Sequence, residues 1–477
     1  MPALNGTMMQ YFHWDYPVDG LLWNEVTRNA TDLAAAGFTA LWLPPPYKAQ
    51  SVSDVGYGAY DLWDMGEFEQ KGAVRTKYGA RAELETAIAA AHAAGLQIYI
   101  DVVFNHKGGA DDWERTGGTP VNRENRNIDI GPEREIGVWT VFNFTGRNGQ
   151  YSTMQWRWRH FDSVDYDQIT QSVGTIYRLR DKQFETPVSD EYGNYDYLMF
   201  SDLDMSVDEV RNELRNWGEW VVRTFDIDGF RFDAAKHIRF FFFNEWLDYV
   251  RGLFPNRELF AVGEHFTSDP ATLDWFLDQT GRRMSLFDFP LYFNMRAASE
   301  GGGGYDMRNL LNNTLVQRSP AQTVTFVDNH DTFREQTERT IQDWFKPLAY
   351  AIILLRDQGY PCVFYGDYYQ VPGRPTQRAI LDRLLAVRRD YAYGPQNDYF
   401  DHPDVIGWTR LGDADHPLAM AVIMSDGPGG SKRMLVDRPN RPFTDVTGNV
   451  SGTVTTTDDG YGEFRCNGGS VSVWVEQ

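Results

Sequence analysis

Four apolar segments of this chain end in charged side chains, and the densest of them covers residues 229–237. It places Arg231, Asp233, Lys236 and His237 directly after an apolar run, so we interpret it as the end of a buried strand. Alternate side chains of a strand point to the same face, which predicts that Arg231 and Asp233 lie side by side. A neighbouring guanidinium lowers the pKa of a carboxyl group. An ionised carboxylate suits a nucleophile, although a structural ion pair has the same pattern.

Three further segments share this pattern and favour an active site over a structural ion pair. Apolar runs within residues 98–106, 259–265 and 324–331 also end in acids, amides or histidines. In a (β/α)8 barrel the active site lies at the C-terminal ends of the strands and is built from several of them. Four such ends in order therefore predict an α/β fold of this type. The side chains concerned are Asp101, Asn105, His106, Glu264, His265, His330 and Asp331.

Helix and strand signals alternate along most of the chain, as a βα-barrel requires. The first expected helix covers residues 22–36 and is closed by Gly37, a residue suited to a left-handed C-cap. We expect strands at 8–12, 39–43, 96–104, 228–233, 259–263, 285–291, 324–327 and 361–365. The other expected helices cover 80–94, 207–225, 243–254, 344–357 and 377–391.

Two regions interrupt this alternation and predict additional domains. Residues 106–205 form a long insertion after the third strand, and such an insertion in a compact enzyme is usually functional. From about residue 396 helical periodicity gives way to short β-type runs, which predicts a C-terminal antiparallel β-sandwich domain. We therefore expect the barrel at 1–105 and 206–395, a β-rich inserted domain B at 106–205 and the C-terminal domain at 396–477.

Composition restricts the partners. The formal net charge of −22 argues against nucleic acid or an anionic membrane as a partner, and no apolar run reaches membrane-spanning length. Cys362 and Cys466 are the only cysteines, and we expect two buried free thiols. Residues 1–7 have no basic or long apolar stretch, which predicts no signal peptide. We expect a cytoplasmic monomer, with a secreted mature form as the alternative.

The four strand ends resemble the four signature regions of the α-amylase superfamily, glycoside hydrolase family 13. The likeness extends over nearly the whole chain. Residues 8–14, 55–62 and 467–472 are similar to the corresponding parts of bacterial liquefying and cytoplasmic-type α-amylases. The resemblance implies retaining endo-hydrolysis of internal α-1,4-glucosidic bonds in starch, glycogen and maltooligosaccharides.

The resemblance also implies roles for individual residues. Asp233 is the expected nucleophile, and Glu264, which follows an apolar run that would raise its pKa, is the expected general acid/base. Asp331 is expected to bind sugar hydroxyl groups and to help distort the ring. Tyr57 lies between two glycines and is either an aromatic platform or a turn residue. The expected substrate contacts are Tyr57, His106, Arg231, Lys236, His237, His265 and His330. His265 and Phe266 depart from the Tyr-Trp pair common in liquefying relatives.

A second set of residues is rich in oxygen ligands, which calcium prefers. The resemblance implies a structural Ca²⁺ between domain B and the barrel. Its expected ligands are Asn105, Asp165, Asp196, Asp202 and the carbonyl group of His237. Relatives often hold further ions, and Glu185 stands where they have an aspartate, so a further cation near Glu185 is a weaker expectation.

Three alternatives stay open at this stage. A barrel that only binds sugar would have lost one of its three acids, and all three are present here. A metal-dependent sugar isomerase could gather the same residue types, but it would release no reducing ends from starch. Within the family, a 4-α-glucanotransferase or a maltooligosaccharide-specific amylase would carry the same acids.

Overall fold

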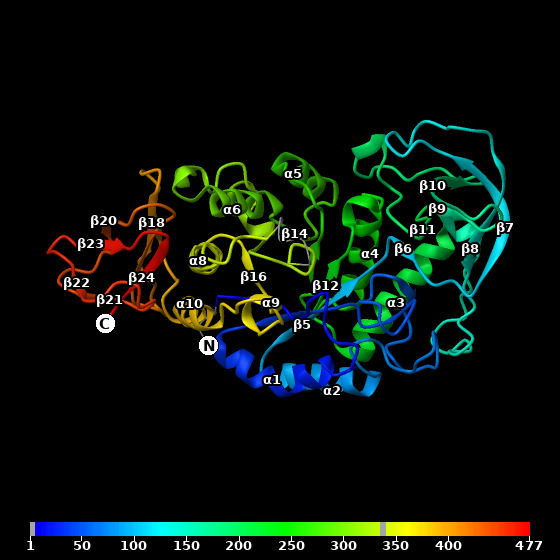
Figure 1. Cartoon of the computed structure of the whole chain (residues 1–477). Coiled ribbons are helices and arrows are strands. Elements are labelled where there is room, and N and C mark those ends of the chain that lie inside the picture. The colour runs from blue at the N-terminus through cyan, green and yellow to red at the C-terminus, as the bar shows by residue number, and fades with distance from the viewer. Residues whose placement is uncertain (1–4, 334–339) are drawn as a thin grey trace.

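A closed barrel of eight parallel strands forms the centre of the molecule (Figure 1). The computed structural model describes residues 5–333 and 340–477. Residues 1–4, on which part of the signal-peptide expectation rests, lie outside the described residues. The strands are β1 (Met8–Gln10), β2 (Ala40–Leu43), β5 (Gln97–Val102), β12 (Gly229–Phe232), β13 (Phe260–Gly263), β14 (Ser285–Phe287), β15 (Thr323–Phe326) and β16 (Tyr360–Phe364). The predicted α/β barrel is confirmed.

Helices surround the barrel, and several of them bury one apolar stripe while their other face stays polar. Helix α1 (Leu22–Ala36) buries Leu22, Val26 and Leu33 among other residues, and Gly37 ends it at the predicted position with a φ of 112°. The other helices are α2 (Arg81–Ala93), α3 (Asp208–Phe225), α4 (Phe240–Leu253), α5 (Pro270–Gln279), α6 (Phe289–Gly301), α7 (Leu315–Arg318), α8 (Lys346–Leu355), α9 (Tyr365–Tyr368) and α10 (Arg378–Asp390).

The structure corrects the predicted strand at 285–291. Strand β14 ends at Phe287, because the buried carboxylate of Asp288 caps helix α6 by accepting a hydrogen bond of 3.0 Å from the backbone N–H of Leu291. The same carboxylate accepts two backbone N–H groups of helix α7. Helices α5 and α6 were absent from the predicted order. Each begins with an aspartate cap followed by proline in its first turn, which is the signal that would have located it.

The insertion after β5 contains a six-stranded sheet in the order β6-β11-β9-β10-β7-β8. These strands are β6 (His106–Lys107), β7 (Asp112–Pro120), β8 (Arg134–Val141), β9 (Phe161–Asp167), β10 (Ser172–Leu179) and β11 (Ser201–Leu203). A small hairpin of β3 (Lys48–Ala49) and β4 (Ala59–Asp61) precedes it in the chain. β6 follows directly on barrel strand β5, so the insertion starts at the rim of the barrel where the predicted functional side chains lie.

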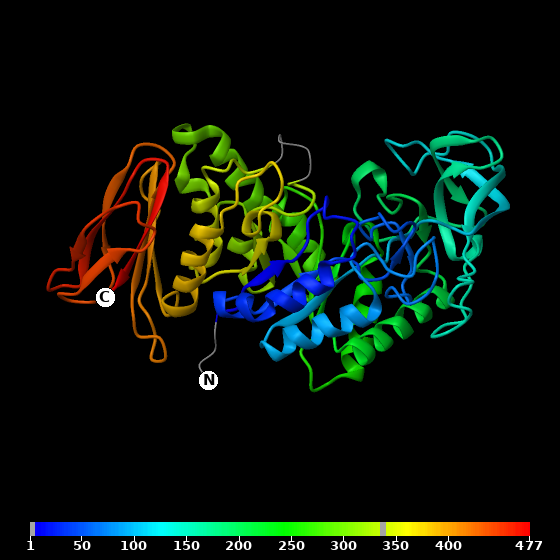
Figure 2. The ribbon, with the colours of Figure 1, turned by 60° about the horizontal axis from the view of Figure 1, so that its bottom comes forward.

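The C-terminal region forms two antiparallel sheets at the end of the molecule opposite the insertion (Figure 2). Its strands are β17 (Gln396–Tyr399), β18 (Val405–Arg410), β19 (Met420–Ser425), β20 (Gly430–Leu435), β21 (Pro442–Asp445), β22 (Thr453–Thr455), β23 (Tyr461–Cys466) and β24 (Ser470–Glu476). Both cysteines are buried and free, as predicted. In the part of the chain that the structure describes, every helix is too short or too polar to cross a membrane.

Candidate active site

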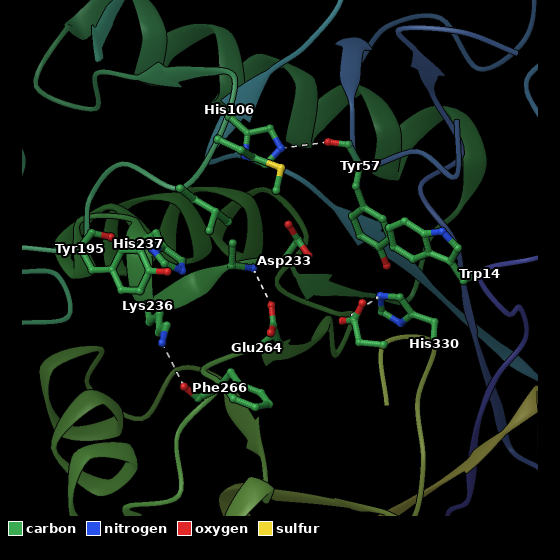
Figure 3. A pocket seen from close by; sticks show the side chains of 14 residues that line it. Trp14, Tyr57, His106, Tyr195, Asp233, Lys236, His237, Glu264, Phe266 and His330 are labelled. Carbon is green, nitrogen blue, oxygen red and sulfur yellow. Dashed lines mark hydrogen bonds and ion pairs between the residues drawn. The ribbon is translucent and has the colours of Figure 1, made fainter. Parts of the chain in front are cut away.

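A cavity of about 290 Å³ opens at the C-terminal ends of the barrel strands. Asp233, Glu264 and Asp331 all line it, although they come from three different strand ends. Figure 3 shows Asp233 and Glu264 pointing into the middle of the cavity, with Tyr57 and His330 on one side and Lys236 and His237 on the other. The barrel therefore brings together the three acids that the sequence pattern singled out.

The guanidinium group of Arg231 connects the acids beneath the cavity. Its Nη1 lies 2.7 Å from Asp233 Oδ1 and 2.9 Å from Asp101 Oδ1, and its Nη2 lies 3.3 Å from Glu264 Oε2. Arg231 is only 1% exposed and does not line the cavity. The substrate contact expected for Arg231 stays a prediction, and in this structure its guanidinium group is placed to hold the two central carboxyl groups close together.

Burial controls the protonation of the two central carboxyl groups. It raises the pKa of Asp233, and the Arg231 guanidinium opposes this shift. The sequence argument considered only the arginine and therefore gave the wrong direction. Burial also raises the pKa of Glu264, and the charges of Asp233 and Asp331 raise it further. Arg231 is closer to Asp233 than to Glu264, which favours the ionised form of Asp233 and the protonated form of Glu264.

Asp331 lies on a tight turn after β15. The side-chain oxygen of Asn329 accepts the backbone N–H groups of Asp331 and Thr332 at 2.9 and 2.8 Å, which fixes the turn. His330 Nε2 lies 3.4 Å from Asp331 Oδ2, and Gln10 Nε2 donates to His330 Nδ1 at 2.8 Å. The turn thus presents a carboxylate and an imidazole side by side to the cavity.

Tyr57 occupies a position that suits both roles left open for it. Its hydroxyl group donates to Asp101 Oδ2 at 2.8 Å, and its ring stacks on His330 with 5.2 Å between centroids. The preceding Gly56 has a φ of 109°, and a Cβ there would lie 2.5 Å from Pro45. The backbone carbonyl group of Tyr57 accepts from His106 Nε2 at 2.9 Å. The turn is therefore tight, and it presents an aromatic ring to the cavity.

Lys236 and His237 stand in a short 3₁₀ turn (Ala235–His237) on the other side of the cavity. Lys236 Nζ donates to Glu191 Oε1 at 2.7 Å and to the carbonyl oxygen of Phe266 at 3.1 Å. His237 Nδ1 donates to the carbonyl oxygen of Tyr195 at 2.6 Å. Glu191 and Tyr195 belong to the insertion, so these contacts tie it to the barrel next to the cavity.

The structure corrects the expectation for His265. This side chain has no exposed surface, does not line the cavity and packs edge-on against Phe276 at 5.0 Å. Burial lowers its pKa to about 3, so it is neutral. Phe266 is 40% exposed and lines the cavity in its place. The alternation of side chains after β13 would have separated the two residues.

The lining residues that sequence reasoning missed also include Trp14, Tyr195, Leu198 and Met199. Trp14 stacks on Tyr57 with 5.9 Å between centroids and extends the aromatic wall. The other three belong to the insertion. Trp14 lies within the segment 8–14 that carried the family resemblance, so a signal for it existed, whereas no periodic pattern marks the other three.

A group of buried acids lies where the insertion meets the barrel. Asp162, Asp196 and Asp202 each offer a ligand atom within 4.8 Å of the others. Asp162 Oδ2 is buried and has no hydrogen-bond partner among the described residues. Burial raises the pKa of all three carboxyl groups, that of Asp162 to about 7, and the charges of neighbouring carboxylates raise them further. An orphaned carboxylate oxygen among crowded negative charges fits a divalent cation.

Two of the five expected ligands belong to this group, and a third adjoins it. Asp196 and Asp202 are in it, and Asn105 Nδ2 donates to Asp202 Oδ1 at 2.8 Å. Asp165 is not in it, because it lies three residues after Asp162 on strand β9 and so points to the other face. Glu185 lies next to the group, since its backbone N–H donates to Asp196 Oδ2 at 2.8 Å. Its buried Oε1 has no partner within the described residues.

Residues 23–382 match the family model for the alpha amylase catalytic domain. The chain is 53% identical to an alpha-amylase of Geobacillus stearothermophilus, with 99% of this chain and 87% of the relative covered. It is 39% identical to the cytoplasmic alpha-amylase of Escherichia coli K12, with 99% of each covered.

A solved structure agrees in fold. The alpha-amylase of Geobacillus thermoleovorans in complex with acarbose aligns with a TM-score of 0.66 at 17% identity, covering 99% of this chain and 98% of that one. The barrel, the three acids at its strand ends and the match over most of the chain lead to one conclusion: the chain belongs to the alpha-amylase catalytic-domain family of glycoside hydrolases.

Proposed function

We propose that this protein is an α-amylase that hydrolyses internal α-1,4-glucosidic bonds in starch, glycogen and maltooligosaccharides with retention of configuration. One observation supports this most directly: a single buried guanidinium contacts Asp233 and Glu264, and both of these carboxyl groups line the same cavity as Asp331. Retention requires two carboxyl groups about 5–5.5 Å apart, and a shared arginine keeps the pair close.

The proposed reaction has two displacement steps. In the first, Asp233 attacks the anomeric carbon while Glu264 donates its proton to the glycosidic oxygen, so that the C–O bond breaks and the leaving chain gains a 4-hydroxyl group. In the second, ionised Glu264 takes a proton from water, and the resulting hydroxide oxygen bonds to the anomeric carbon. The Asp233–glycosyl bond breaks, and both carboxyl groups return to their starting states.

The other cavity residues are proposed to bind and orient the sugar. Tyr57 supplies a stacking ring, and His330 and Asp331 supply polar contacts that tighten as the ring flattens toward the transition state. His106, on the same side as Tyr57, extends these contacts. Lys236, His237 and Phe266 line the opposite side, where we place the leaving-group chain.

The products formed from defined substrates test this proposal. An endo-hydrolase should release a range of short maltooligosaccharides from starch and from maltoheptaose and leave pullulan largely intact. Chromatography of early time points separates the alternatives. Products longer than maltoheptaose would identify a 4-α-glucanotransferase, and one dominant product length would identify a maltooligosaccharide-specific amylase.

Above the pH optimum, the rate should depend on the fraction of Glu264 that is protonated. A general acid must be protonated, so kcat/KM should fall as pH rises through its pKa. Burial and the charges of Asp233 and Asp331 raise the pKa of Glu264, so this limb should lie above the ordinary range of a glutamate. Asp331→Asn removes one of these charges and should lower the pKa of Glu264. The basic limb of kcat/KM, measured on the residual activity of this variant, should therefore move to lower pH. An unmoved limb would mean that another group is the acid.

We further propose that Ca²⁺ is a structural cofactor held by Asp162, Asp196 and Asp202, with Asn105 and the His237 carbonyl group beside them. When bound, the ion would neutralise crowded carboxylates and tie the insertion to the barrel. Asp162 replaces Asp165 in this set because of its place in the acid group. A further cation near Glu185 remains a proposal on the strength of its buried, unpartnered oxygen.

Chelation tests the calcium proposal. A ligand that binds only the folded state stabilises it by mass action, so EDTA should lower the melting temperature by several degrees and added Ca²⁺ should restore it. Asp202→Ala should lower the melting temperature and remove the response to EDTA. Exposed Asp415 is the matched control, and Asp415→Ala should behave like the parent protein. Purified protein without bound calcium, and with no shift on chelation, would exclude the site.

Three organisational proposals accompany the function. We propose a barrel domain at 1–105 and 206–395, domain B at 106–205 and a C-terminal domain at 396–477, and limited proteolysis would locate these boundaries. We also propose a monomer, which size-exclusion chromatography with light scattering tests. The name of the Escherichia coli relative supports a cytoplasmic location, and cell fractionation tests it.

A further inference from the structure

A second cavity, of about 680 Å³, lies outside the catalytic centre. Residues 149–155 of the insertion form one of its walls, and helix α3 forms another. It shares no lining residue with the active-site cavity and is more than twice as large. Its volume falls within the range of about 300–1,000 Å³ that is typical of small-molecule sites. The mechanism gives it no role.

The aromatic ring of Tyr151 lines this cavity, and its neighbours fix its position. Tyr151 is 36% exposed, and its hydroxyl group donates to Glu67 at 2.9 Å. The Arg81 guanidinium lies 5.4 Å from its ring centroid, and Trp220 packs against it at 5.1 Å. An aromatic ring that is fixed on several sides and still exposed offers an apolar surface at a small entropic cost.

Unused polar groups accompany the ring. Glu213 Oε1 accepts from Trp63 Nε1 at 2.8 Å and from Ser152 Oγ at 2.6 Å, which fixes the carboxylate. Among the described residues, its Oε2 has no hydrogen-bond partner. The same holds for the amide nitrogen of Gln155 and for the whole side-chain amide of Asn216. The cavity therefore combines one apolar surface with several available donors and acceptors.

This combination selects the chemical class of the ligand. Glu209 and Glu213 both line the cavity and disfavour an anion. Arg159, which lies 3.6 Å from Glu209, and the two donors already bound to Glu213 Oε1 disfavour a metal ion. A sugar is neutral and has an apolar ring face and adjacent hydroxyl groups, which match a tyrosine ring with carboxylate and amide groups beside it.

We propose that this cavity is a second, non-catalytic oligosaccharide site that binds a glucan segment. That the glucan is an α-1,4 chain rests on the proposed function. A polymer long enough to reach both cavities would be held at two points, and the second binding event would benefit from a high effective concentration. The site should therefore strengthen binding of starch and glycogen without changing the chemistry on short chains.

Calorimetry with maltoheptaose on a Glu264→Gln background tests the proposal without turnover. We expect two binding events per chain. Tyr151→Ala should leave one event, and Asn216→Ala should weaken the second at least about fivefold. The exposed side chain of Asn216 makes no hydrogen bond within the described residues, so its replacement should leave the fold intact. Tyr461→Ala is the control, because Tyr461 also lies under an arginine but belongs to β23.

Activity on two substrates completes the test. In the otherwise wild-type enzyme, Tyr151→Ala should raise the KM for amylopectin at least about fivefold and leave kcat/KM for maltoheptaose within about twofold. A single binding event with the cavity intact, or an equal loss in Tyr461→Ala, would overturn the proposal. Hydrolysis of maltoheptaose by the parent enzyme tests the proposed function separately, since binding to the Glu264→Gln variant requires no turnover.

Discussion

Asp233→Asn is expected to lower kcat by about four orders of magnitude or more, because an amide cannot form the glycosyl–enzyme bond. The protein should stay folded, since the amide keeps the size of the side chain and Arg231 retains its contact with Asp101. The melting temperature should stay the same or rise, because three carboxyl groups share one guanidinium in the parent protein and the variant removes one charge.

The measurement pairs steady-state kinetics on maltoheptaose with a thermal scan. Asp415→Asn makes the same chemical change at an exposed position and should leave both quantities unchanged. If Asp233→Asn keeps more than a few per cent of the parent rate, Asp233 is not the nucleophile. A large fall in melting temperature would assign the residue a structural role.

Glu264→Gln should also abolish turnover of starch, with a different dependence on the leaving group. Glutamine cannot donate a proton to the departing glycosidic oxygen. A maltosyl fluoride needs little protonation to lose its leaving group, so Glu264→Gln should still form the glycosyl–enzyme on this substrate. Asp233→Asn should not.

This difference separates the two carboxyl groups by role. Fluoride release from both variants is followed under single-turnover conditions. A fluoride burst with Glu264→Gln and none with Asp233→Asn is the expected result. The reverse pattern would exchange the two assignments, and equal loss in both would leave Glu264 without a role as acid.

The fold was largely predictable because its signals are local. Residues 22–36 carry a helical apolar stripe and a closing glycine, and the structure has α1 at these residues. The strand ends were predictable because ionisable side chains at the end of a buried apolar run lose hydration, and such groups are concentrated at functional sites. Strand 285–291 was wrong because the Asp288 cap, which also binds the start of α7, stops β14 early.

The sequence predicted those features of the site that depend on a single segment of the chain. Asp233 and Glu264 directly follow β12 and β13, and Asp331 lies on the turn after β15, so strand direction places all three at the cavity. Arg231 stands two residues before Asp233, inside β12, and it lies beneath the cavity among the carboxyl groups of Asp101, Asp233 and Glu264. A contact between distant segments leaves no mark on the local pattern.

The acid group illustrates the same limit. Asp162 and Asp165 stand in one short acidic run, and both are possible ligands by composition. Only the pairing of β9 with β11 sets Asp162 beside Asp202 and turns Asp165 away. The exchange of His265 for Phe266 at the cavity wall has a similar cause, since the backbone path after β13 decides which ring is exposed.

The stereochemistry of the first product tests the central claim most directly. Proton NMR of fresh maltoheptaose digests, recorded before mutarotation, reports which anomer forms first. Two displacements at the anomeric carbon, the first by Asp233 and the second by water, predict that the α-anomer appears first and the β-anomer grows in later. Appearance of the β-anomer first would mean a single displacement by water and would contradict the account.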